Sequence, residues 1–156
     1  MRTSSTAAAA GAVAVTAVVG TAGTDVRSRW YRRLDKPSWQ PPGPVFGGAW
    51  TTLYVVLALA GGRALGRAEG DRLRGYTRSY VANLVVNAGW TWVFFRARRP
   101  RLAVAESALL TASTVDLTRR TWQLDRTAGL ALLPYAGWTA FATALSGEIA
   151  RRNPGA

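Results

Sequence analysis

The chain carries its charges in short clusters that are separated by long stretches without any charged residue. The four longest uncharged stretches are residues 3–24, 37–62, 79–95 and 127–147. Each has the length of roughly 17 to 25 residues with which a helix crosses a bilayer. A fifth segment, residues 102–118, has the same length and holds two acidic residues between arginine clusters. The pattern predicts an all-α integral membrane protein, folded as a bundle of five transmembrane helices.

We expect one transmembrane domain over residues 1–156. Residues 24–44, rich in proline and tryptophan, would connect its first two helices. Pro134 should bend the last helix, because proline cannot donate the backbone hydrogen bond of a helix interior. The expected helices lie at about residues 5–23, 45–64, 76–96, 101–121 and 127–149.

The first helix contains Ala, Val, Gly and Thr but no Leu, Ile or Phe, and it allows two interpretations. One is a signal peptide that is removed by cleavage. The other is a retained helix whose small side chains let neighbouring helices approach closely. The small residues in question are Ala7, Gly11 and Ala14 on one side and Gly20 and Gly23 near the end.

Composition and charge exclude several classes of protein. A net charge of +12 suits a nucleic-acid binder, but the arginines stand at the expected helix ends, where lipid headgroups lie, and form no stripe along a helix. The chain has no cysteine and no histidine, which excludes disulfides, thiolate metal sites and the commonest haem and zinc ligand. We therefore expect no nucleic-acid partner and no metal site.

The cations also bear on the membrane and the orientation. Eleven cations lie on the side of the proline-rich loop and the C-terminus and nine on the other side, which weakly favours a cytoplasmic location for that loop. Nineteen arginines against one lysine, with abundant alanine and glycine, are typical of a GC-rich bacterial genome. The expected location is a bacterial plasma membrane.

Aromatic and polar residues recur at helical spacing in three of the expected spans. Asn83 and Asn87 should point inward, because an unpaired amide in hydrocarbon costs several kcal/mol. The stripes suit either the packed interior of a bundle or a pocket for a flat, mostly apolar ligand. They consist of Phe46, Trp50 and Tyr54; of Tyr80, Asn83, Asn87, Trp90 and Phe94; and of Tyr135, Trp138, Ala142 and Leu145.

Two carboxylates, Glu106 and Asp116, lie within the fourth span. A carboxylate in a membrane span is a functional candidate by default. Each is near one end of the span, however, so we favour pairing with the arginines of residues 98–101 or with Arg119 and Arg120. No catalytic triad, phosphate-binding loop or paired carboxylate at catalytic spacing is present in the sequence.

Three motifs closely resemble the TspO/MBR family, which comprises the tryptophan-rich sensory proteins and the translocator protein, or peripheral-type benzodiazepine receptor. They are "WYRRLDKPSWQPPGPVFGGAWTTLY", "NLVVNAGWTWVFF" and "LLPYAGWTAFATAL", in this order. The resemblance covers about residues 5–153 and implies five transmembrane helices, a retained first helix and a long first loop folded over one mouth of the bundle as a lid. It also implies a homodimer and a pocket for porphyrins such as protoporphyrin IX.

Carried over position by position, the resemblance implies a specific set of ligand-binding residues. Pro41 and Pro42 would belong to the lid. The pocket and lid residues would be Trp39, Trp50, Tyr54, Asn87, Trp90, Phe94, Ala105, Leu109, Trp138, Ala142 and Leu145.

The chain departs from the family pattern at several places. Gly48 stands where the family usually has proline, so we expect a looser junction between lid and helix at Gly47 and Gly48. Ser146 and Gly147 stand where animal members have the proposed sterol motif, so sterol transport is not expected. The absence of histidine favours a metal-free porphyrin or an iron porphyrin held without histidine.

The expected function is a sensory or translocator protein that binds a tetrapyrrole and takes part in porphyrin or stress signalling. The expected partners are membrane lipid, the tetrapyrrole and a second copy of the chain, and no cofactor is obligatory. One alternative is an enzyme that degrades porphyrin with light and oxygen, in which Trp50 and Trp138 would be the catalytic candidates; another is a transporter of porphyrin or lipid. Ligand propionates would meet cations of the loop, namely Arg29, Arg32, Arg33 or Lys36.

Overall fold

The computed structural model describes residues 2–156 and, for side chains, residues 4–156. This part of the chain is all-α and contains no strand, which confirms the predicted fold class. The elements are α1 (Arg2–Gly23), α2 (Arg29–Arg33), α3 (Gly43–Leu65), α4 (Gly70–Thr91), the π-helical turn η1 (Trp92–Arg96), α5 (Pro100–Leu124), α6 (Arg126–Ala131) and α7 (Leu133–Arg152).

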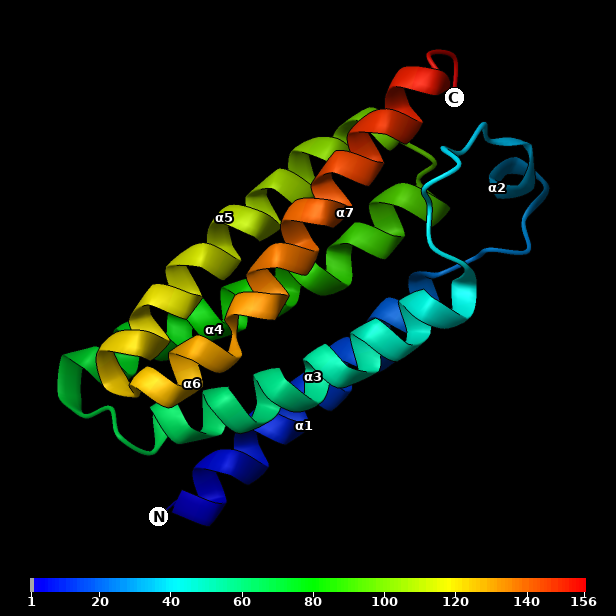
Figure 1. The fold of residues 1–156 in the computed structure, drawn as a ribbon. Helices are drawn as coiled ribbons and strands as arrows, with labels where there is room; N and C mark the ends of the chain where they lie inside the picture. The colour runs from blue at the N-terminus through cyan, green and yellow to red at the C-terminus, as the bar shows by residue number, and fades with distance from the viewer. Residues whose placement is uncertain (1) are drawn as a thin grey trace.

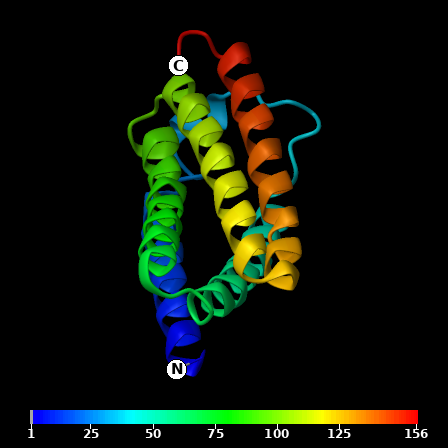
Figure 2. The same cartoon turned by 90° about the vertical axis from the view of Figure 1, so that its left-hand side faces the viewer.

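The long helices form a ring of neighbours. α1 packs between α3 and α4, α4 packs on α5, and α5 packs along the length of α7. The ring closes through α6, which contacts α3, whereas α3 and α7 touch only sparsely. Helix α2 and the C-terminus lie at one end of the bundle, here called the lid end, and the N-terminus lies at the opposite end (Figures 1 and 2).

By length and composition, three helical segments are apolar enough to cross a membrane: Ser4–Gly23, Gly43–Leu65 and Arg126–Arg152, the last of which joins α6 and α7. The other two long helices, α4 and α5, carry charged residues. In α5, Glu106 and Asp116 lie within the expected span, while α4 carries its charges in its first turns.

The helix ends differ from the expected ones where proline or glycine sets them. α3 begins at Gly43 and not near residue 45, because Pro44 fits the first helical turn, where no backbone donor is needed. The helix then runs on through Gly47 and Gly48, so the expected loose junction is absent from these described residues. α4 begins at Gly70, six residues before the expected start, and the last span is divided at Leu132, where Pro134 stands in the first turn of α7.

The packing of α1 corrects the expected small-residue face. Ala7, Gly11 and Ala14 are exposed, and the buried face follows Ala9, Val13, Thr16 and Gly20. Of the expected small residues, Gly20 and Gly23 are buried, and the close approach depends on Gly23 and on Gly62 of α3. A Cβ at Gly62 of α3 would lie 2.6 Å from the Thr6 Cα, and a Cβ at Gly23 would lie 2.5 Å from the Thr91 Oγ1. Helix α1 is therefore an integral part of the bundle, held where backbones nearly touch.

Candidate ligand site at the lid end

A chain of buried polar side chains crosses the middle of the bundle. The Tyr54 hydroxyl donates to Asn87 Oδ1 at 2.8 Å, and Asn87 Nδ2 donates to the Tyr135 hydroxyl at 2.8 Å. That hydroxyl donates in turn to Asn83 Oδ1 at 2.8 Å, and Asn83 Nδ2 donates to Thr114 Oγ1 at 3.0 Å. Hydrogen bonds between buried side chains thus join four helices, α3, α4, α5 and α7.

This polar chain explains why the two asparagines face inward as expected. Asn83 is 0% exposed and Asn87 5% exposed. Every hydroxyl and amide of the chain has a partner within it, so the chain forms a closed floor and needs no further polar group. A ligand that lies on this floor would meet aromatic rings and no free amide.

Aromatic rings lie on the lid side of this floor between α3 and α7. The Trp50 ring lies 5.5 Å from Tyr54 and 6.4 Å from Tyr135, measured between ring centroids. Phe46 meets Trp138 edge-on at 5.6 Å. Trp138 contacts Phe141 at 5.3 Å, and Phe141 contacts Trp39 of the lid at 5.8 Å. One group of these rings therefore lies against the lid and another group lies against the floor.

A second set of rings joins the lid to the end of α4. Trp90 and Phe94 stack with an interplanar angle of 11° and a centroid distance of 5.1 Å. Trp30 of α2 meets Phe94 at 5.6 Å, and Tyr31 meets Phe95 at 5.2 Å. The π-helical turn η1, closed by the Ala97 N–H to the Trp92 carbonyl at 2.8 Å, holds Phe94 and Phe95 both in the interior. Such turns are frequent at functional sites.

Four buried polar atoms in the described side chains have no hydrogen-bond partner: Gln40 Oε1, Trp90 Nε1, Glu106 Oε2 and Trp138 Nε1. They come from the lid, α4, α5 and α7, and all lie on the lid side of the polar floor. An unpaired buried polar group costs about 1 to 3 kcal/mol. The unsatisfied groups are therefore concentrated where the aromatic rings gather.

The two carboxylates of α5 differ. Asp116 pairs with Arg120 at 2.6 Å and with Arg119 at 3.6 Å, as expected. For Glu106, the described residues provide no ion pair, which corrects the expected pairing with residues 98–101. Its Oε1 instead lies over α4, 2.6 Å from where a Cβ on Gly89 would stand.

The expected ligand-binding residues separate into two groups. Trp50, Tyr54, Asn87, Trp90, Phe94, Trp138 and Leu145 are buried or half-buried inside the bundle, Ala142 is half-buried, and Trp39 is a half-exposed lid residue. Ala105 and Leu109 are not brought to the same place. Leu109 is 57% exposed and Ala105 is also exposed, because α5 turns Ala103, Ser107 and Leu110 toward its neighbours instead.

The lid is fastened to the end of α7. The Asp35 N–H donates to Asn153 Oδ1, and Asn153 Nδ2 donates to the Asp35 carbonyl, both at 2.9 Å. Lys36 is already engaged, because its ammonium bonds the Leu34 carbonyl at 3.1 Å and lies over the Tyr31 ring. The other expected cations, Arg29, Arg32 and Arg33, are exposed and remain accessible to a ligand carboxylate.

An acidic residue that the sequence did not single out organises the opposite end. Asp125 is buried between α5 and α6, bonds Arg63 Nε at 2.8 Å, pairs with Arg67 and caps α6 through the Ala128 N–H at 3.1 Å. Burial alone would raise the pKa of Asp125, but the hydrogen bonds from Arg63 and Ala128 and the charges of both arginines hold it below its ordinary value. The signal in the sequence is Asp125 directly before a helix, a common N-cap.

The comparisons with known proteins agree with this architecture. A model of the TspO/MBR family matches residues 7–152. The chain is 37% identical over 124 residues to the tryptophan-rich sensory protein of Cereibacter sphaeroides, covering 80% of this chain and 77% of that protein. It is 35% identical to protein CrtK of Rhodobacter capsulatus over 81% of this chain and 79% of that protein, and 35% identical to the human translocator protein over 81% and 76%.

Proposed function

Because the chain belongs to the TspO/MBR family, we propose that it binds a tetrapyrrole of the protoporphyrin class between the lid and the polar floor. The chain is an integral, multi-pass membrane protein of a family whose fold is a bundle of five transmembrane helices. Its similarity to a tryptophan-rich sensory protein supports a sensory role, in which the bound state changes the lid that a partner reads.

The observation that carries this proposal is the pair of buried indole N–H groups without acceptors. Trp90 Nε1 and Trp138 Nε1 lie in two aromatic sets that both reach the lid. A flat macrocycle can stack on indole faces, and its nitrogen or carboxylate acceptors can take up these donors. A ligand would therefore remove a cost that the free protein carries.

The helix packing supports entry of the ligand between α3 and α7. The aromatic rings pack against one another, so they must separate before a macrocycle can bind. The sparse contact between α3 and α7 makes this the side of the ring that separates with the least loss of packing. The exposed lid arginines can then meet the propionates through charge-assisted hydrogen bonds.

The test is a titration of the purified protein with protoporphyrin IX, followed by absorbance in the dark. Trp138→Phe and Trp90→Phe keep a ring but remove the N–H, and each should weaken binding about fivefold, the equivalent of one hydrogen bond of about 1 kcal/mol. Trp92→Phe is the matched control, because the Trp92 indole is on the surface and already donates to the Val19 carbonyl at 3.0 Å. It should leave the affinity unchanged.

The proposal is overturned if protoporphyrin IX does not bind saturably, or if all three variants bind like the unaltered protein. The same titration in light addresses the enzymatic alternative. Loss of the porphyrin bands in light, abolished in Trp138→Phe while dark binding persists, would assign porphyrin breakdown to the site.

A further inference from the structure

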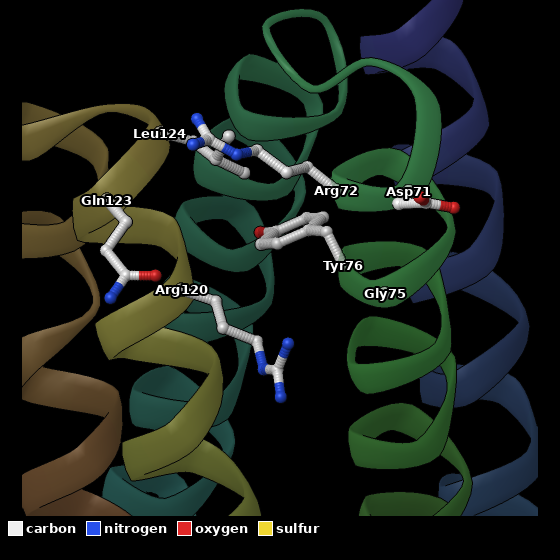
Figure 3. A pocket seen from close by; sticks show the side chains of 7 residues that line it. All are labelled: Asp71, Arg72, Gly75, Tyr76, Arg120, Gln123 and Leu124. Atoms are coloured by element: carbon white, nitrogen blue, oxygen red, sulfur yellow. The ribbon is translucent and has the colours of Figure 1, made fainter.

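A cavity of about 660 Å³ lies at the end of the bundle opposite the lid, between the first turns of α4 and the last turn of α5 (Figure 3). None of the expected ligand-binding residues lines it. Its walls come from Asp71, Arg72, Gly75 and Tyr76 of α4 and from Arg120, Gln123 and Leu124 of α5.

The floor of this cavity is rigid and offers little polarity of its own. Tyr76 is 2% exposed, and its hydroxyl is bonded to Thr121 Oγ1 at 3.0 Å. Gly75 has no side chain and leaves the space beside this ring open. A Cβ added there would lie 3.7 Å from Arg120 Nη1, which is an ordinary van der Waals contact. A larger side chain at Gly75 would therefore enter the cavity without displacing the backbone.

The rim offers hydrogen-bond donors that are not used within the protein. Neither Arg72 nor Gln123 has an ion pair or side-chain hydrogen bond to any residue that the structure describes. Arg120 engages Asp116 through its Nε at 2.6 Å, so that its terminal nitrogens remain beside the cavity. The single carboxylate of the lining, that of Asp71, is paired with Arg74.

Two other arginines at this end are engaged away from the cavity. Arg63 and Arg67 both engage the buried Asp125, which neutralises part of their charge and fixes their positions. Positive charge in excess therefore remains at the cavity, which Arg72 of α4 and Arg120 of α5 line on either side of the Tyr76 ring.

We propose that this cavity binds the phosphate of an anionic phospholipid headgroup. Guanidinium groups match phosphate oxygens in geometry and charge. Arg120 lies two residues after the fourth expected span, 102–118, and Arg72 lies seven residues before the uncharged stretch 79–95. Both therefore lie at the headgroup end of their helices. Leu124 supplies an apolar wall for the glycerol. Trp122, a half-exposed residue in the last turn of α5, is typical of the interface. The proposal is independent of ligand binding at the lid end.

The test measures the preference of the protein, reconstituted in phosphatidylcholine bilayers, for spin-labelled phosphatidylglycerol over spin-labelled phosphatidylcholine. Arg72→Gln should lower this preference about fivefold, since a cation near an anionic lipid contributes about 1 kcal/mol. Gly75→Leu, which narrows the cavity beside Arg120 but changes no charge, should lower it by a similar factor. Neither variant should change the affinity for protoporphyrin IX.

Arg126→Gln is the control, because Arg126 is an exposed cation at the same end that does not line the cavity. It should leave the preference nearly unchanged. An equal loss in Arg126→Gln, or no loss in Gly75→Leu, would show diffuse surface attraction and would overturn the proposal. Displacement of the spin-labelled lipid by inorganic phosphate at matched ionic strength would overturn the assignment to lipid, because the free anion would then be the ligand.

Discussion

Removal of a single hydroxyl group, in Tyr135→Phe, interrupts the polar floor at its centre. Tyr135 is 0% exposed, and its hydroxyl is the one group that joins Asn87 to Asn83. The substitution keeps the ring, so it leaves the aromatic packing intact and opens no large cavity. It leaves Asn87 Nδ2 without an acceptor and Asn83 Oδ1 without a donor.

The magnitude follows from those two lost bonds. Interhelical hydrogen bonds in membrane proteins contribute about 0.6 kcal/mol on average, with a maximum of about 1.7. Both bonds here are 2.8 Å long and fully buried, which places them toward the upper part of this range. We therefore expect Tyr135→Phe to lower the free energy of unfolding by about 2 kcal/mol.

The measurement is unfolding in mixed micelles by added SDS, followed by circular dichroism. Tyr80→Phe is the control, because the Tyr80 hydroxyl is also buried but makes one bond, to the Leu57 carbonyl at 3.1 Å. That carbonyl belongs to the middle of α3, so the control should lose no more than about 1 kcal/mol. The role of the floor would be refuted if Tyr135→Phe cost no more than Tyr80→Phe.

Three further perturbations address other parts of the molecule. Asp125→Asn keeps the helix cap but loses the charge. Because the pKa of Asp125 in the folded protein lies below the unfolded value of about 3.9, the wild-type protein should have the larger free energy of unfolding above that pH. This difference should vanish as the pH falls through the folded pKa. Glu106→Met should raise the free energy of unfolding by about 1 kcal/mol in SDS titrations, since an unpaired buried oxygen is removed; a decrease would mean that Glu106 has a partner in the bilayer. Asn153→Ala should speed hydrogen exchange in residues 34–40, because it frees the lid at Asp35, while exchange at residues 60–67 stays unchanged.

The sequence predicts those parts of the structure that depend on local physics. Asn83 and Asn87 had to face inward because lipid offers no hydrogen-bond partner. Asp116 had to pair with Arg119 and Arg120 because residues three and four apart are neighbours on a helix. These inferences need only the period of the helix and the fact that lipid surrounds the bundle.

The sequence is less informative where a position depends on which helix is the neighbour. The family resemblance implies that Ala105 and Leu109 line the pocket, and a separation of four residues puts them on one face of α5, but neither shows whether that face meets lipid. α5 is packed through small, hydroxyl-bearing and leucine side chains alike, while other apolar side chains such as Leu109 and Val115 are outward. Apolar side chains are as stable against lipid as inside the bundle, so the composition of a helix does not show which of its faces is buried.

Glu106 shows the same limit for charges. Its nearness in sequence to the arginines of residues 98–101 suggests a pair, but α5 begins only at Pro100. Arg98 adopts a positive φ of 55° outside the helix, and Arg101 donates to the Pro154 carbonyl at 3.3 Å. The turn between η1 and α5 thus decides whether an arginine of residues 98–101 can reach Glu106. The geometry of this turn cannot be predicted from helical spacing.

The two ends of the bundle differ in a way that bears on how a ligand enters. At the end opposite the lid, Asp125 ties Arg63 and Arg67 of α3 to the junction of α5 and α6. At the lid end, α3 meets α7 mainly through rings such as Phe46 and Trp138. Helix α3 can therefore swing away from α7 about a fixed point near Asp125. If protoporphyrin IX enters there, it should slow hydrogen exchange in residues 34–50 and leave residues 60–67 unaffected; equal protection of both segments would contradict a fixed point at this end.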